Sequence, residues 1–166
     1  MTRESIRNII FYTTILVSQL LIFNHFNLFN VITPSVYLII FILYKTSYSK
    51  TSLIFLGFIT GLIIDLAMQT YGCHTFASIT VCYLRERIEK YSFGVNANLP
   101  SAMIKGTKII NRLTFFMLII LIHSSIYYSL VFFNIEVIGK IFYYSLINSI
   151  VTFIMVWIFS QLISNN

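Results

Sequence analysis

Six apolar runs, separated by short polar intervals, follow one another along the 166-residue chain. They cover residues 9–23, 34–44, 51–71 and 73–84, a fifth run that ends near residue 133, and 141–163. A helix needs roughly 20 apolar residues to cross a bilayer. The second run is shorter, so we expect that its helix is tilted, that the bilayer is locally thinned around it, or that it is extended through residues 45–48 by a snorkelling lysine. The fourth is also short, and we expect its helix to continue into the charged segment 85–90.

The polar intervals predict where these helices begin and end. Pro34 suits the opening of the second helix, because the first turn of a helix leaves its amide hydrogens unpaired anyway. The longest interval, 85–112, contains the helix breakers Gly94 and Pro100. No internal repeat or low-complexity segment interrupts the pattern. The sequence therefore predicts one helical bundle over residues 1–166.

Asp65 is the one carboxylate that lies within an apolar run. It follows Gly57 and Gly61 at steps of four residues, so the three positions share one stripe of a helix. Glycines at this spacing let another backbone approach closely, and that neighbour can supply hydrogen bonds to an embedded polar group. Two interpretations remain open. The acid is either a structural hydrogen-bond anchor or a functional ionisable group.

The candidate partners of Asp65 lie on the fourth run. A turn at Gly72 would make the third and fourth helices antiparallel, with Ser78 level with the acid and Thr75 one turn further out. His74 lies nearer the turn, where we expect it to be a solvated cap residue.

Further polar residues lie in the last two runs. His123 stands near the middle of the fifth run and is either an interhelical hydrogen-bonding residue or part of a proton relay. The sixth run carries a stripe of small polar residues at helical spacing, which predicts a packed helix interface. This stripe consists of Ser145, Asn148, Ser149 and Thr152.

Composition places the chain among integral membrane proteins. Hydrophobic residues make up 58% and charged residues 10%, with a mean hydropathy of +0.86, whereas soluble domains carry about a quarter charged residues. The chain has eleven Lys and Arg residues against five Asp and Glu. The basic residues fall between the apolar runs and form no continuous groove, which argues against nucleic acid as a partner. With six spans and a cytoplasmic amino terminus, every Lys and Arg except Lys140 lies on the cytoplasmic side. We therefore expect both termini in the cytoplasm.

Three of these cations share one face of an amphipathic segment before the fifth run. They are Lys105, Lys108 and Arg112. Such a segment lies at a membrane surface, with either anionic lipid or an acidic cytoplasmic protein as the partner of its cations.

The chain lacks the residue groupings of a cofactor site or a hydrolase. Cys73 and Cys82 are separated by roughly 13 Å along one predicted helix, which is beyond disulfide reach. The three histidines lie on three different segments, so no metal-ligand spacing is present and no cofactor is expected. Neither GxSxG nor HExxH occurs, and a second embedded acid is lacking, so an enzyme is disfavoured.

The hairpin GFITGLIIDLAMQTYGCHTFASITVCYLRE resembles the MreD family, small multi-spanning proteins of the bacterial rod-shape machinery. The matching positions are Phe58, Gly61, Asp65, Gly72 and Arg85. The later stretch HSSIYYSLVFFNIEV, which contains His123 and Glu136, is similar to a segment before the last span in some members. This resemblance implies a non-enzymatic scaffold in the bacterial inner membrane. Such a scaffold binds MreC and helps couple MreB filaments to RodA and a penicillin-binding transpeptidase.

The MreD family is similar in fold to the S components of energy-coupling factor transporters, which are compact six-helix bundles that bind vitamins. A vitamin-binding transporter subunit is therefore the alternative function. S components carry Ala-x-x-x-Ala in their first helix, and the first apolar run of this chain has no alanine. This departure favours the scaffold.

Overall fold

The computed structural model describes residues 3–26, 32–45, 48–94 and 107–164, and this part of the chain is helical without a strand. The elements are α1 (Arg3–Ser18), the π-helix η1 (Gln19–Phe23), α2 (Leu38–Ile42), α3 (Lys50–Met68), α4 (Cys73–Phe93), α5 (Ile109–Phe132), the 3₁₀ turn η2 (Ile135–Val137) and α6 (Ile138–Ser164). Five of the six apolar runs thus form helices of at least 16 residues.

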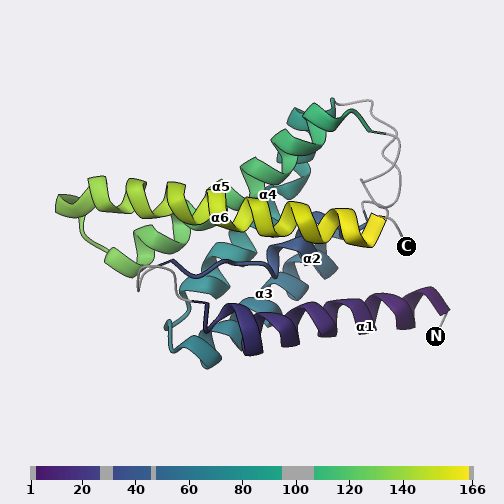
Figure 1. Ribbon diagram of the computed structural model, residues 1–166, viewed down its shortest axis with the longest axis horizontal. Coiled ribbons are helices and arrows are strands. Elements are labelled where there is room, and N and C mark those ends of the chain that lie inside the picture. Colours follow the sequence, from purple (N-terminus) through teal and green to yellow (C-terminus); the bar gives the residue numbers. More distant parts are fainter. Residues whose placement is uncertain (1–2, 27–31, 46–47, 95–106, 165–166) are drawn as a thin grey trace.

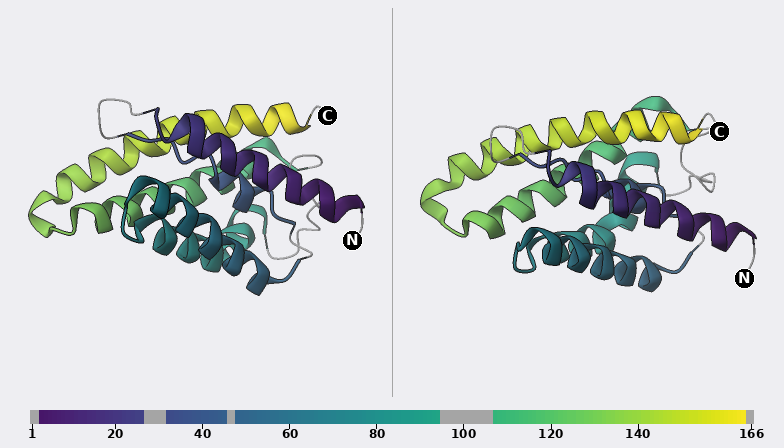
Figure 2. Two further views of the ribbon diagram at one scale, coloured as in Figure 1. Left: turned by 90° about the horizontal axis from the view of Figure 1, so that it is seen from below. Right: turned by 60° about the horizontal axis from the view of Figure 1, so that its bottom comes forward.

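The long helices lie roughly along one axis and alternate in direction (Figures 1 and 2). Helices α1, α3 and α5 run one way, whereas α4 and α6 run the other way. The beginning of α1 and the end of α6 therefore lie at the same end of the molecule. Neighbours in sequence are also neighbours in space, because α3 packs on α4, α4 on α5 and α5 on α6.

Among the described residues, four helical regions are long and apolar enough to cross a membrane. They contain the stretches Ile6–Phe23, Lys50–Met68, Ile109–Phe132 and Ile135–Leu162. Helix α4 is also long, but it continues through the charged residues to Phe93, as the sequence predicted. The fold is thus all-helical, with the composition and helix lengths of a membrane protein.

The second apolar run differs from its prediction. The expected helix from Pro34 is reduced to the five residues of α2, and residues 36–42 have no exposed surface. A tilted or extended span would need a long helix, whereas this segment lies inside the bundle between the long helices. Because it is enclosed on all sides, its backbone groups must find partners on other elements.

Side chains from distant helices supply these partners at both ends of the segment. Gln19 of η1 accepts a hydrogen bond from the Tyr37 amide at 3.1 Å and donates one to the Pro34 carbonyl at 3.0 Å. Thr152 of α6 accepts from the Ser35 amide at 3.1 Å. At the other end, Arg85 binds three carbonyl oxygens, as described below. Irregular backbone at membrane depth is tolerated when protein groups satisfy it in this way.

The orientation of the chain in a membrane can be tested with reporter fusions. Fusions after Lys50, Lys90 and Asn166 are expected to report the cytoplasm, and a fusion within 24–33 the outside, because this topology keeps ten of eleven cations inside. The measurement is paired phosphatase and fluorescent-protein reporter activity. An external carboxyl terminus would show that the interrupted second segment or α4 does not cross.

Candidate functional site

Glycines bring α3 and α4 into backbone contact. A Cβ atom added at Gly61 would lie 2.5 Å from the Thr75 Cα and 2.9 Å from the His74 carbonyl oxygen. At Gly57 the nearest atom would be the Cys82 Sγ at 2.7 Å. The predicted close approach at the glycine stripe is therefore confirmed, and the approaching helix is α4.

Alanine substitutions at the glycines should show a graded loss of stability. Gly61→Ala is expected to cost about 1 to 3 kcal/mol, because its methyl group meets backbone that cannot rotate away. Gly57→Ala should cost less, since the Cys82 side chain can move. Gly139→Ala is the matched control, because no atom lies within 4 Å of the added Cβ. SDS titration in mixed micelles, followed by circular dichroism, measures the series. Equal costs at Gly61 and Gly139 would contradict the packing argument.

Asp65 closes the turn between α3 and α4. One carboxylate oxygen accepts from the His74 amide at 3.0 Å and from the Thr70 hydroxyl at 2.5 Å. The other accepts from the Thr75 amide at 2.7 Å and from the Thr75 hydroxyl at 2.5 Å. The carboxylate thus pairs amide hydrogens in the first turn of α4, where the helix dipole also favours a negative charge.

The turn that joins the helices has a left-handed backbone. Gln69, which directly follows α3, has φ 55°, and Gly72, which directly precedes α4, has φ 92°. Tyr71 between them also has a positive φ of 50°. Gly72 suits this conformation because it has no Cβ. Gln69 and Tyr71 hold the same left-handed conformation although each carries a Cβ atom. The hydrogen bonds of the Asp65 carboxylate therefore stabilise a strained turn.

These contacts decide between the expected partners of Asp65. Thr75 is confirmed as a partner. Ser78 is not one, because its hydroxyl lies 3.1 Å from the Tyr37 hydroxyl instead. The expectation that His74 is solvated is wrong, since only 3% of its surface is exposed. Its amide is capped by the acid, and its ring points into the bundle, where it lies against Tyr37.

A buried polar cluster centres on the hydroxyl of Tyr37. This oxygen lies 2.7 Å from His123 Nε2, 3.1 Å from Ser78 Oγ and 3.3 Å from His74 Nδ1. Tyr37, Ser78 and His123 have no exposed surface. The cluster joins the buried segment to α4 and α5. His123 is therefore an interhelical hydrogen-bonding residue, as one of its two interpretations expected, but it shares its partner with a second histidine.

Each imidazole ring in this cluster keeps one nitrogen unused. His74 Nε2 and His123 Nδ1 are buried without a hydrogen-bond partner among the residues that the structure describes. The two rings are stacked, with centroids 6.0 Å apart and an interplanar angle of 26°. The Tyr127 ring stacks on the His74 ring, with the ring centroids 4.3 Å apart. Tyr127 also lines a surface pocket of about 550 Å³ beside the α3–α4 turn.

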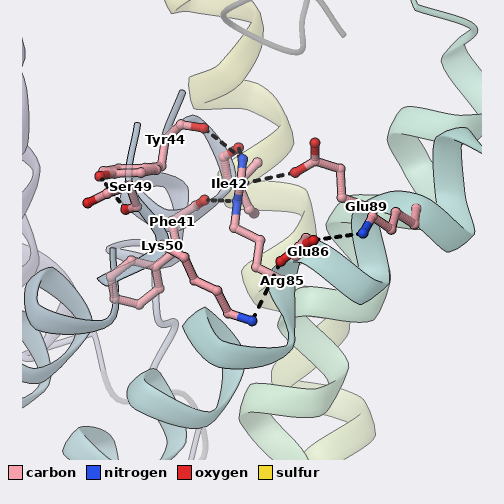
Figure 3. A network of polar contacts seen from close by, with 9 residues as sticks. Phe41, Ile42, Tyr44, Ser49, Lys50, Arg85, Glu86 and Glu89 are labelled. Atoms are coloured by element: carbon pink, nitrogen blue, oxygen red, sulfur yellow. Dashed lines mark hydrogen bonds and ion pairs between the residues drawn. The ribbon is translucent and has the colours of Figure 1, made fainter. Parts of the chain in front are cut away.

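Arg85 of α4 binds the carboxyl-terminal end of α2 (Figure 3). Its guanidinium donates to the carbonyl oxygens of Phe41 at 2.8 Å, Tyr44 at 2.7 Å and Ile42 at 3.5 Å. It also pairs with Glu89 at 3.0 Å, and both side chains are more than nine-tenths buried. A cation at the carboxyl end of a helix is electrostatically favourable. Arg85 thus anchors the carboxyl-terminal end of the buried segment, as Gln19 and Thr152 anchor its beginning.

A second ion pair, one residue further along α4, shows the contrast with an exposed site. Lys90 lies 2.7 Å from Glu86, and both side chains are about half exposed. The hydrogen bond and charge of Lys90, together with the charge of Lys50, lower the pKa of Glu86. Exposed pairs of this kind contribute little to stability.

The remaining sequence candidates are dispersed. The small polar stripe of α6 is buried and bonds to α5, with Asn148 donating to Ser124 at 3.3 Å. Lys108 is exposed before α5, and the Arg112 guanidinium lies 5.2 Å from the centre of the Trp157 ring. Lys105 lies outside the described residues.

The described residues contain no group of three or more His, Cys, Asp or Glu side chains placed to hold a metal ion. What the arrangement offers instead is a hairpin whose two helices are in backbone contact and a buried, hydrogen-bonded cluster around the Tyr37 hydroxyl. Sequence reasoning missed Tyr37 and the structural role of Arg85. A tyrosine inside a short apolar run was the available signal for the first. No known protein family, no functionally characterised protein and no solved structure detectably matches this chain.

Proposed function

We propose that the chain is a non-enzymatic scaffold subunit of the bacterial cell-wall elongation complex, similar to MreD, in the cytoplasmic membrane. Its partners would be an MreC-like single-span protein and, through it or directly, MreB, RodA and a penicillin-binding transpeptidase. The observation that carries this proposal is that residues of the resemblance build the hairpin and attach the buried segment to it.

Each of four residues in the resemblance has a distinct structural task. Gly61 admits the backbone of α4, and Asp65 caps that helix. Gly72 takes the left-handed conformation before α4, and Arg85 anchors the end of α2. All four tasks are architectural, as expected of residues in a non-enzymatic scaffold, which supports the proposal.

The same contacts favour a scaffold over an enzyme. An intramembrane hydrolase needs a nucleophile beside a base, or two acids that share a substrate. The carboxylate of Asp65 already accepts four hydrogen bonds, two of them from backbone amides. A carboxylate engaged in this way stabilises a turn and is poorly placed to act as a general base.

Affinity purification from a mild detergent, with mass spectrometry of the bound proteins, tests the proposal. We expect an MreC-like protein and wall-synthesis enzymes to co-purify with the wild-type chain. Gly139→Ala should retain them, whereas Gly61→Ala should lose them in proportion to its loss of folded protein. Recovery of transporter ATPases instead would identify a vitamin-binding S component and contradict the scaffold.

A further inference from the structure

We propose that His74, Tyr37 and His123 form a proton relay inside the bundle, with water as the proton donor at one end and the proton acceptor at the other. The relay goes beyond the scaffold function and does not depend on it. It joins α4, the buried segment at α2, and α5 through a single phenolic oxygen.

The hydrogen-bonding capacity of that oxygen gives the cluster two equivalent arrangements. A tyrosine hydroxyl donates one hydrogen bond and accepts two. In the first arrangement Tyr37 donates to His123 Nε2, at 2.7 Å, and accepts from His74 Nδ1–H, at 3.3 Å. In the second, Tyr37 donates to His74 Nδ1 and accepts from His123 Nε2–H. Ser78, at 3.1 Å, donates to the same oxygen in both.

Passage of one proton converts the first arrangement into the second. Hydronium gives a proton to His74 Nε2, and the proton on His74 Nδ1 moves to the Tyr37 oxygen. The original phenolic proton moves to His123 Nε2, and the proton on His123 Nδ1 leaves to water. Both rings and the phenol end neutral, and one proton has moved from one end of the chain to the other without any heavy atom changing place.

The unused nitrogens are the ends that such a relay requires. A static clamp would need only the two ring nitrogens that face Tyr37. The opposite nitrogens, His74 Nε2 and His123 Nδ1, are nine-tenths or more buried and have no partner among the described residues. A buried polar atom without a hydrogen-bond partner costs free energy, so its presence in a folded protein requires an explanation. Proton transfer at these two nitrogens provides one.

One neighbouring carboxylate favours a transient positive charge on the relay, whereas the burial of both rings opposes it. The Asp65 carboxylate of α3 favours the protonated form of both histidines, whereas the His74 ring disfavours a positive charge on His123. The other titratable groups near the phenol are Tyr127 of α5 and Cys82 of α4. Asp65 is the charged member of this set, and it is held in place by its four hydrogen bonds.

Nitrogen-15 NMR of the full chain in lipid nanodiscs, labelled only at histidine, tests the relay. The chain has three histidines, so three pairs of ring signals are expected, and His→Gln variants assign them. His25 is exposed and provides the reference for an ordinary ring. We expect both nitrogens of His74 and of His123 to show shifts between the protonated and bare limits, because each ring exchanges between tautomers.

Two phenylalanine variants separate the relay from a general change in packing. Tyr37→Phe removes the shared hydroxyl. It should move the nitrogen-15 shifts of both rings to the protonated and bare limits, because each ring is then held in one tautomer. Tyr127→Phe keeps the ring that stacks on His74 and should leave the averaged shifts unchanged. If every ring nitrogen of His74 and His123 in the wild-type protein had the nitrogen-15 shift of a fully protonated or a fully bare nitrogen, the cluster would be a fixed set of hydrogen bonds and the proposal would be overturned. Averaged shifts that persist in Tyr37→Phe would also overturn it.

Discussion

Replacing Arg85 with leucine is expected to lower the free energy of unfolding by about 3 to 5 kcal/mol, the cost typical of breaking a buried ion pair by removing one partner. The loss has two parts. Glu89 would keep its charge in a site where more than nine-tenths of its side chain is buried. The carbonyl oxygens of Phe41 and Tyr44, bound at 2.8 and 2.7 Å, would lose their charged donor.

Helix α4 supplies the control for this measurement. Lys90→Gln removes a pair with the same spacing on the same helix, but on its exposed side, and should change stability by no more than about 0.5 kcal/mol. Arg85→Lys keeps the charge yet cannot match the planar set of donors, so it should fall between the two. SDS titration, followed by circular dichroism, measures all three. Similar costs for Arg85→Leu and Lys90→Gln would contradict the anchoring role.

The long helices could be predicted because their signals are local. A continuous apolar run of sufficient length, ended by a polar interval, predicts a helix whatever the rest of the chain does. The glycine stripe and Asp65 also lie within one such run, so their shared face follows from helical geometry. For the same reason the continuation of α4 through Arg85 to Phe93 followed from the sequence.

The break in the second run could not be predicted, since what stabilises it is remote. Its partners are Gln19 on η1, Arg85 on α4 and Thr152 on α6. An apolar stretch that ends in a short helix has the same hydrophobic pattern as a short tilted span. Only the three-dimensional positions of these side chains show that the backbone can leave the helix without unpaired groups.

The buried cluster around Tyr37 was missed for a related reason. Considered alone on its own segment, His74 predicted a solvated cap residue, and His123 predicted either an interhelical hydrogen bond or part of a proton relay. Tyr37 joins them across separations of 37 and 86 residues, which periodicity cannot detect. The assignment of Ser78 to Asp65 failed similarly, because the turn geometry gave its level on α4 but not the approach of Tyr37 from the buried segment to its hydroxyl.

Substitutions at Asp65 should separate its two interpretations. Asp65→Leu removes all acceptors from the Thr70 hydroxyl and from the amides of His74 and Thr75. Unpaired buried donors cost about 1 to 3 kcal/mol each, and the loss of an embedded acid offsets about 2 kcal/mol. Three such donors, less this offset, give an expected net cost of about 1 to 7 kcal/mol. Unfolding by SDS provides the value.

Asparagine at position 65 separates shape from charge. Its amide oxygen can still accept from one backbone amide, and the threonine hydroxyls can rotate to accept from its NH₂ group, but the second backbone amide loses its partner. Asp65→Asn should therefore cost about 1 to 2 kcal/mol, accumulate in the membrane and retain its bound partners if the acid is an anchor. If the charge itself contacts a partner, Asp65→Asn should be stable yet purify alone, and Asp65→Glu should restore the complex. Because the carboxylate is only 5% exposed and faces the first turn of α4, we expect the first outcome, with partner binding falling only as the hairpin unfolds.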